Sequence, residues 1–562
     1  MLLDNPEGLA NSTAHQSMGH VTAVLMNWMN NLSDLEGAAA GTPGNHKSFR
    51  SFESNIDIFE GQGLVDELQH LGLTRVTIES WAKDVEKISE SSFKIFTAQM
   101  GRGADLDCGK ERCLSTGFIK ILSSLFSTLK NIFKDERRNL NAFRLVRYDT
   151  VKLDPLRNNI RRRESTMGFW CLSSEVIFEE ISQKAKAIIL TSGTLSPMDT
   201  FASELQTAFP LQLEAQHVIE ASQLFVGTFA AGPSGSNLIG TYQNTSSFTY
   251  QDDVAQCIYQ ICQVTPFGVL CFLPSYALLD KLLDRMQATG VYEKLARLKE
   301  VISEPKSGST DDFERLMKRF YRTIADCKQH GGRAAATGPG RRHAVTGAVL
   351  FAVYRGKVSE GLDFADEHAR AVINIGIPYP AFKDQKVLLK KEYNDRHVGS
   401  KQLLPGSQWY EIQAFRALNQ ALGRCIRHRH DWGAVVFLDQ RFTHPKNIQK
   451  LSKWVRPSVR GYSALGEGIA ALRAFMKGKG AALPEELMLE ATPQQPAAPA
   501  RAPAPLPGRK RLVDFDEDEA DAAPAPPPAR APASAAPPSG ISVFFQSKKT
   551  LGARPKRPAS EE

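Results

Sequence analysis

GAVLFAVYRGKVSEGLDF, residues 347–364, decides the fold class, because a continuous apolar run is followed at once by a polar turn that contains two glycines. Amphipathic segments with helical spacing separate this run from others of the same kind. Strands that are apolar on both faces and are joined by helices form parallel sheets covered on both sides. We therefore predict an α/β fold. The predicted strands are KAIILTSG (186–193), GVLCFLPS (268–275), GAVLFAVY (347–354), AVINIGIP (371–378) and GAVVFLD (433–439), and two predicted helices are 252–263 and 410–424.

The turn after residue 354 is a candidate site, because functional groups of open parallel sheets collect at the carboxyl ends of the strands. Such a turn can offer backbone N–H groups to a phosphate, and a carboxylate to a ribose or an arginine. The alternative is an ordinary strand-to-helix loop. The residues of this turn are Arg355, Gly356, Lys357, Ser359, Glu360, Gly361 and Asp363.

A second candidate is QALGRCIRHRHDWG, residues 420–433. Gln420, Gly423, Arg424 and Arg427 lie at the end of the predicted helix, and the two arginines are three residues apart, on one helix face. Two guanidinium groups on one face can hold phosphoryl oxygens, and Gly423 lets another backbone approach. The alternative is a solvated basic helix.

Two weaker candidates also follow predicted strands. In LTSGTLSPMD (190–199), Ser192 and Thr194 can relay between a nucleotide and a nucleic acid. In FLPSY (272–276), Ser275 and Tyr276 can contact a phosphate backbone. The alternatives are a plain strand-to-turn boundary and a buried turn.

The rest of the chain shows less chemistry. The first 165 residues are predicted to be mostly helical, from apolar residues at helical spacing. The Gly/Arg-rich insertion 330–347 is interpreted as a flexible surface loop, with a nucleic-acid-binding arm as the alternative. The Ala/Pro-rich tail 476–562 is predicted to be disordered, because its composition cannot bury a core.

Charge and cysteine content limit the function classes. Eight scattered cysteines argue against a disulfide framework and for a reducing compartment. A net charge of +8 is compatible with a polyanionic partner without proving one. No apolar run approaches the roughly 18 residues that span a bilayer, so we expect no membrane partner.

In order and spacing, the four candidate segments resemble motifs III, IV, V and VI of superfamily 2 DNA helicases, in the iron–sulfur class related to xeroderma pigmentosum group D. The resemblance is strong over 166–475 and weak over 20–165. It implies a RecA-like, P-loop NTPase-type fold. The implied domains are a helical arch-like region (1–165), the carboxyl end of the first motor domain (166–205) and the second motor domain (206–475). The segments that carry the resemblance are GFWCLSSEV, AIILTSGTLSPMDTFASEL, LCFLPSY, RGKVSEGLDF, YPAFKDQKV and QALGRCIRHRHDWG.

The resemblance also implies roles. Arg424 and Arg427 would be arginine fingers, and Gln420 would meet the γ-phosphate. Family members use ATP, Mg²⁺ and a 4Fe–4S cluster for 5′-to-3′ unwinding of DNA in the nucleus, in cross-link repair and on structured DNA such as G-quadruplexes. The implied ATP-site residues are Glu360, Gly361, Asp363 and Gly423, and the implied DNA contacts are Ser192, Thr194, Ser275, Tyr276, Arg355 and Lys357.

The sequence departs from the family in three ways. It has no G-x-x-x-x-G-K-[ST] loop to hold the β- and γ-phosphates, and no DEAH-type string to supply an Mg²⁺ carboxylate. The four cluster cysteines are missing too, and Cys108 and Cys113 are interpreted as an unliganded pair. We expect the chain alone to be inactive as an ATPase. An incomplete gene model is our preferred interpretation, and a genuine fragment is the alternative.

The tail leaves open a second class of function, a DNA-binding or partner-binding scaffold. Ile541, Phe544 and Phe545 have the spacing of a peptide that docks on a sliding clamp, although Pro538 stands where that motif has Gln. An incidental apolar patch is the alternative. The basic clusters at 509–511 and 554–557 are predicted to direct nuclear import, with solvated charge as the alternative.

Overall fold

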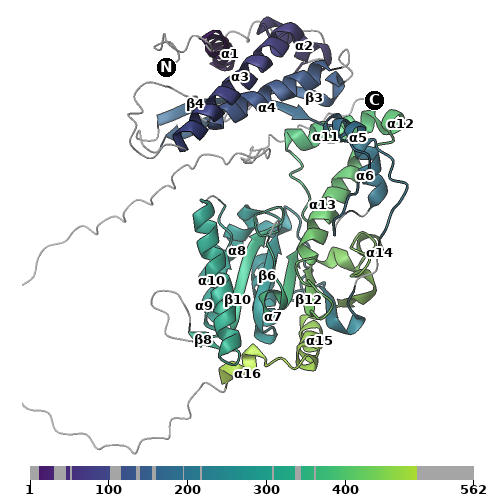
Figure 1. Cartoon of the computed structure of the whole chain (residues 1–562). Helices are drawn as coiled ribbons and strands as arrows, with labels where there is room; N and C mark the ends of the chain where they lie inside the picture. Colours follow the sequence, from purple (N-terminus) through teal and green to yellow (C-terminus); the bar gives the residue numbers. More distant parts are fainter. Residues whose placement is uncertain are drawn as a thin grey trace, which may run out of the picture. The chain divides into compact units, whose positions relative to one another are not determined.

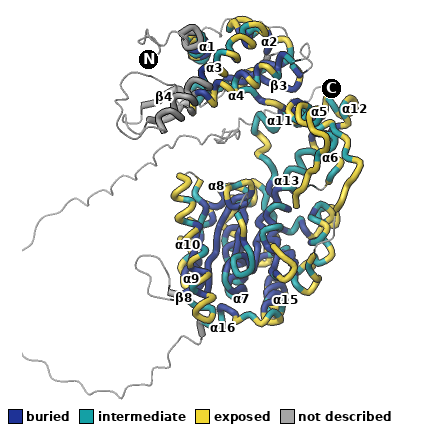
Figure 2. Tube along the Cα trace, in the orientation of Figure 1, coloured by how far each residue is buried: buried dark blue, intermediate teal, exposed yellow. Residues whose placement is uncertain are grey.

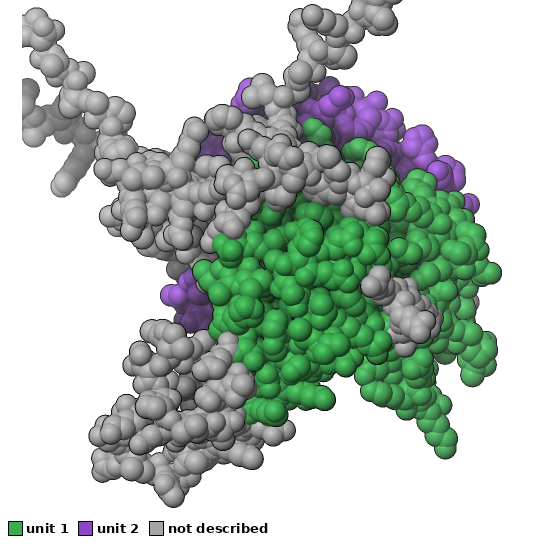
Figure 3. All heavy atoms as spheres, turned by 90° about the horizontal axis from the view of Figure 1, so that it is seen from above, with its two compact units in different colours: residues 1–214, 379–413, 537–562 green, residues 215–378, 414–536 purple. Residues whose placement is uncertain are grey.

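The computed structural model describes residues 12–30, 46–50, 54–100, 116–134, 139–154, 160–193, 195, 197–214, 218–306, 309–335, 344–359 and 362–489. These residues form two compact units, coloured separately in Figure 3. Unit 1 takes its described residues from 1–214 and 379–413, and unit 2 takes its own from 215–378 and from 414 onward.

Unit 2 is built on a parallel sheet whose seven described strands have the order β13-β5-β12-β11-β6-β10-β7 (Figure 1). The central strands are buried along their whole length, as the dark blue tube of Figure 2 shows. The predicted α/β fold with a parallel sheet is therefore confirmed, together with its strands near 268, 347, 371 and 433. The strands are β5 (Leu224–Phe229), β6 (Phe267–Leu273), β7 (Glu300–Ser303), β10 (Gly347–Val353), β11 (Ala371–Ile375), β12 (Gly433–Leu438) and β13 (Val459–Tyr462).

Helices cover the sheet of unit 2. One apolar core joins the sheet to α7 (Phe248–Val264), α8 (Tyr276–Ala288), α9 (Val291–Leu298) and α15 (Leu465–Gly478). Helix α10 (Thr310–Gln329) packs on β6, β7 and β10 through residues outside that core. The remaining elements are α13 (Gly406–Leu422), which runs from unit 1 into unit 2, α14 (Pro445–Ile448), α16 (Pro484–Leu489), and the short pair β8 (Ala334–Ala335) and β9 (Ala344–Val345) at the base of the 330–347 insertion.

Unit 1 contains a sheet that the mostly helical prediction for residues 1–165 missed. Its four described strands are antiparallel, in the order β1-β2-β3-β4. Buried positions of these strands carry paired charges, such as Arg147 with Asp57 at 3.1 Å, and these charges hide the alternation of a half-buried strand. The strands are β1 (His46–Arg50), β2 (Ser54–Phe59), β3 (Phe143–Asp154) and β4 (Ile160–Cys171), and the helices are α1 (Ser12–Asn30), α2 (Gly61–His70), α3 (Arg75–Met100), α4 (Thr116–Phe133), α5 (Glu175–Lys184), α6 (Met198–Leu205), α11 (Gln385–Arg396) and α12 (Val398–Lys401).

Two further details differ from the sequence analysis. Residues 186–193 form no strand, and Ile189 is 84% exposed, so the strand predicted there is wrong. The segment 379–413 belongs to unit 1, where Leu389, Tyr393 and Leu403 join the apolar core, although we had placed it inside 206–475. The boundaries of the predicted motor domains stay a prediction. No helix of the described residues is long and apolar enough to cross a membrane.

Candidate functional site

The carboxyl ends of β6, β10 and β7 bring together the polar residues that follow each strand. After β6, the Ser275 hydroxyl caps α8 by accepting from the N–H of Leu278 at 3.2 Å. The next residue, Tyr276, donates its phenol to Glu304 Oε1 at 3.2 Å. After β10, Arg355 has a φ of 61° and donates to the carbonyl of Pro378 at 2.9 Å. Three residues predicted to bind DNA therefore lie at one edge of the sheet.

Glu304 organises this edge. Its carboxylate accepts from the backbone N–H of Val353 at 3.1 Å and of Lys357 at 2.6 Å, besides the phenol of Tyr276. Burial raises the pKa of the Glu304 carboxyl. A Cβ on Gly356 would lie 2.5 Å from Glu304 Oε1, so the turn requires glycine there. Glu304 is not among the residues predicted from the sequence, although it directly follows strand β7 and the rule on carboxyl ends applies to it.

The segment from Tyr354 to Arg370 then runs from this carboxyl edge to the opposite, amino edge of the sheet. Its start follows β10, whereas the N–H of Arg370 donates at 2.9 Å to the carbonyl of Gly268, near the first residue of β6. Along the way Ser359 and Phe364 are fully buried. This segment, which we call the motif V segment, therefore touches both edges of one sheet.

Arg424 is bound to the middle of this segment. Its guanidinium donates to the carbonyl of Ser359 at 2.5 Å and to the carbonyl of Leu362. Helix α13 ends at Leu422, so Arg424 and Arg427 follow the helix, and our prediction that they share a helix face is wrong. What brings them together is the motif V segment that both contact.

Arg427 is more accessible than Arg424. Its Nε pairs with Asp363 Oδ1, and the two side chains are 36% and 70% exposed. Its backbone N–H donates to Asp431 Oδ2 at 3.0 Å. An exposed ion pair of this kind contributes about 0–1 kcal/mol. The Arg427 guanidinium can therefore exchange its carboxylate partner for another anion at small cost.

A buried ion pair lies next to Arg427 in the structure. Asp431 pairs with Arg370 at 2.9 Å, both side chains are almost fully buried, and the Arg370 guanidinium lies 4.3 Å from the centroid of the Trp432 ring. His428 Nε2 lies 3.0 Å from Asp366 Oδ1, and both of these side chains are exposed. The Arg370–Asp431 pair holds the residues that precede β12. Because Asp431 also accepts from the backbone N–H of Arg427, the pair fixes the position of Arg427.

The remaining predicted residues lie in different places. Gln420 is half-buried in the last turn of α13. The atoms nearest to a Cβ built on Gly423 are carbonyl oxygens 3.6 Å away, so no close backbone approach requires this glycine. Ser192 is exposed in unit 1. The predictions for Thr194, Glu360, Gly361, Cys108, Cys113 and the tail residues Ile541, Phe544 and Phe545 lie outside the described residues.

The described residues do not fit an iron–sulfur cluster. Their one group of three side chains of metal-binding type is Asp366, His428 and Asp431, and it contains no cysteine. Burial raises the pKa of the Cys262 thiol to about 12 and that of Cys327 to about 11. Thiols of this kind are poor sources of the thiolates that clusters need.

Comparison with known proteins agrees with this geometry. Residues 258–458 match the family described as "Helicase C-terminal domain". The matched stretch is thus similar to helicase C-terminal domains. It contains the loop after β6, the motif V segment and both arginines.

Similar curated proteins confirm the predicted resemblance. The Fanconi anemia group J protein homolog of Gallus gallus is 40% identical over 450 residues, which cover 75% of this chain and 34% of the relative. The Regulator of telomere elongation helicase 1 homolog of Arabidopsis thaliana is 38% identical over 386 residues, covering 66% of this chain and 35% of the relative. The chain thus spans about a third of these curated relatives.

Solved structures show only a distant likeness. An XPD helicase structure has a TM-score of 0.38 and 17% sequence identity, and the match covers 68% of this chain and 64% of that one. A score at this level supports no argument about function.

Proposed function

We propose that this chain supplies the arginine-bearing part of an ATP-driven DNA helicase motor that moves 5′-to-3′ in the nucleus. One observation carries the proposal. The motif V segment is bound at its middle by Arg424 and Arg427, and its start carries Arg355 and Lys357 at the opposite edge of the same sheet. A single segment therefore connects the candidate nucleotide residues to the candidate DNA residues.

The two arginines have different tasks in this proposal. Arg427 is half-exposed and exchangeable, so it stabilises the negative charge that develops on the transferred γ-phosphoryl group when ATP and Mg²⁺ are bound. Arg424 holds the Ser359 and Leu362 carbonyls and positions the segment, so it acts through the backbone. Gln420, in the last turn of α13, is the proposed partner of the γ-phosphate.

The start of the segment, at Arg355 and Lys357, provides the proposed coupling between the nucleotide residues and DNA. In this proposal, a movement of Asp363 toward or away from Arg427 reaches the turn that Glu304 holds through the buried Ser359, which Arg424 also binds. Lys357 and Arg355 in that turn, with Tyr276 beside them, are the proposed contacts to the phosphate backbone. Cross-link repair and the unwinding of G-quadruplexes are the processes we propose for the complete motor.

The test compares Arg427→Ala with Lys357→Gln in a protein that joins this chain to a first motor domain with a phosphate-binding loop. We expect Arg427→Ala to lower kcat of the DNA-stimulated ATPase by about 10³-fold, on the precedent of arginine fingers, and to leave DNA affinity unchanged. Lys357→Gln should weaken DNA binding and leave basal turnover in place. The reverse pattern would assign Arg427 to DNA and reject the proposal.

The chain alone provides a second check. Residues 1–562 contain no phosphate-binding loop, so purified protein with single-stranded DNA and Mg·ATP should release no phosphate above background. Turnover that disappears in Arg427→Ala would contradict this expectation.

A further inference from the structure

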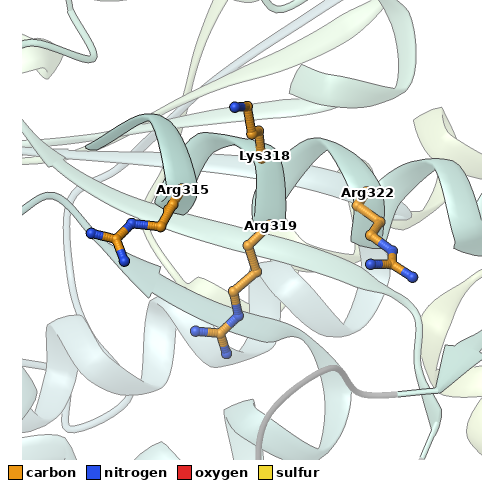
Figure 4. Close-up of a pocket in the computed structure, with 4 residues that line it drawn as sticks. All are labelled: Arg315, Lys318, Arg319 and Arg322. Carbon is orange, nitrogen blue, oxygen red and sulfur yellow. The ribbon is translucent and has the colours of Figure 1, made fainter. Parts of the chain in front are cut away.

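Helix α10 carries a row of four cations on its solvent side. Arg315, Lys318, Arg319 and Arg322 alone line a hollow of about 270 Å³ (Figure 4). The three arginines project to one side of the helix in this view, whereas the Lys318 side chain points to the other side. The buried side of α10 packs on the sheet through Met317, Phe320 and Ile324, among others. We call Arg315, Lys318, Arg319 and Arg322 the α10 row.

Three cations of the α10 row are dispensable for folding. Only Arg319 reaches a buried group, the carboxylate of Glu300. Arg315, Lys318 and Arg322 are 73%, 79% and 79% exposed, and their partners are acidic residues of the same helix, three or four positions away. Such pairs stabilise a helix by about 0.2–0.5 kcal/mol each. A phosphate can therefore replace these carboxylates at little energetic cost.

The α10 row begins beside the proposed DNA contacts. Helix α10 follows β7, so its first turn lies at the carboxyl edge of the sheet, and the Lys357 Nζ is 5.5 Å from the centroid of the Phe313 ring in that turn. From Arg315 to Arg322 the helix rises about 10 Å, at 1.5 Å per residue. A strand with the B-form rise of about 3.4 Å per nucleotide would place about three phosphates along this length.

We infer that the α10 row binds the phosphate backbone of single-stranded DNA as the strand leaves Arg355 and Lys357. The inference rests on the proposed function and adds a binding surface to it. Contacts to phosphates alone fix the path of the strand and carry no sequence preference. The row thus lengthens the track over which unit 2 holds one strand.

The test measures binding of a labelled oligodeoxythymidine to the full chain at several salt concentrations. The row variant is Arg315→Gln, Lys318→Gln and Arg322→Gln together, which keeps Arg319 as the partner of Glu300. The control variant is Lys281→Gln, Lys294→Gln and Arg297→Gln, which removes the same charge from exposed positions on α8 and α9. All six side chains are exposed, so both variants should keep the melting temperature of the unaltered chain.

We expect the row variant to lower the slope of log affinity against log salt by about 2, since each phosphate of single-stranded DNA contributes about 0.7. The control should keep the original slope. An equal loss in both variants would show a general charge effect and overturn the inference. A glutamate-rich peptide that binds the row as tightly as the oligonucleotide would reassign it to an acidic protein segment and also overturn it.

The inference and the proposed function fail in distinguishable ways. If Lys357→Gln weakens binding while the row variant binds normally, the α10 row is not part of the track and the proposed function stands. If the unaltered chain does not bind the oligonucleotide at all, both are rejected.

Discussion

Arg424 and Arg427 come from one short motif but are held by different bonds. Arg424 makes charge-assisted hydrogen bonds to two carbonyls, whereas Arg427 pairs with a carboxylate that is 70% exposed. We therefore expect Arg424→Gln to lower the free energy of unfolding by about 2 kcal/mol. The loss in Arg427→Gln should stay below about 1 kcal/mol. Urea unfolding of the full chain measures both, and equal losses would mean that Arg424 does not hold the motif V segment.

Lys299 provides a pH-dependent prediction at the same scale. It is fully buried at the amino end of β7, donates to the carbonyls of Phe267 and Thr346 at 3.0 and 3.2 Å, and interacts electrostatically with the thiols of Cys262 and Cys327. Burial lowers the pKa of the Lys299 amine to about 8. The unfolded chain therefore binds more protons between pH 8 and about 10.5, and the Lys299 contribution to stability rises with pH across that window, by up to about 3 kcal/mol.

Lys299→Met removes this titration. We expect the variant to gain melting temperature relative to the unaltered chain at pH 7–8, and the gain to shrink as the pH approaches 10.5. Lys281→Met, at an exposed position, should show no such trend. Because buried thiols and phenols titrate in the same range in both proteins, only the difference between them is diagnostic. A difference that is constant with pH would mean that folding does not lower the pKa of Lys299.

At the scale of the elements, the turn after β10 depends on the fit between Gly356 and Glu304. A methyl group at residue 356 would displace the carboxylate that accepts from Val353 and Lys357. We expect Gly356→Ala to cost about 1–3 kcal/mol of stability and to weaken oligonucleotide binding. Gly466→Ala, in the first turn of α15 with no atom within 4 Å, is the matched control and should be neutral or slightly stabilising. Equal behaviour of the two variants in unfolding and in binding assays would remove Glu304 from the role we give it.

Apolar runs in the sequence predict most of the strands of unit 2 correctly, and one predicted strand is absent. The runs at 268–275, 347–354, 371–378 and 433–439 became strands because each is apolar on both faces and has a neighbour on both sides. The run at 186–193 also has four consecutive apolar residues, but none of the described strands pairs with it, and apolarity alone does not supply a hydrogen-bonding partner. Of the candidate site, the motif residues could be found from their order. The bonds of Arg424 to the Ser359 and Leu362 carbonyls depend on tertiary packing, which no local pattern contains.

At the scale of the whole molecule, the chain crosses between its two units more than once. Residues 379–413 interrupt unit 2 in sequence and pack within unit 1, where Lys390 donates to the carbonyl of Leu172 at 2.7 Å and Lys47 pairs with Glu392 at 2.9 Å. Leu389, Tyr393 and Leu403 are each less than 5% exposed. A fragment 206–475, which resemblance alone defines as a domain, would leave these three side chains without their partners.

This arrangement predicts effects of opposite sign in the fragment and in the full chain. In the isolated fragment 206–475, Leu389→Ser, Tyr393→Ser and Leu403→Ser together should raise solubility and reduce the binding of a hydrophobic dye, because they remove an exposed apolar patch. In the full chain the same three changes should lower the melting temperature, because burying a large apolar side chain contributes about 1.5–3 kcal/mol. Dye fluorescence and calorimetry on both proteins measure the two effects. A destabilisation of equal size in the fragment would show that 379–413 finds its partners inside 206–475, and the division into these two units would then be wrong.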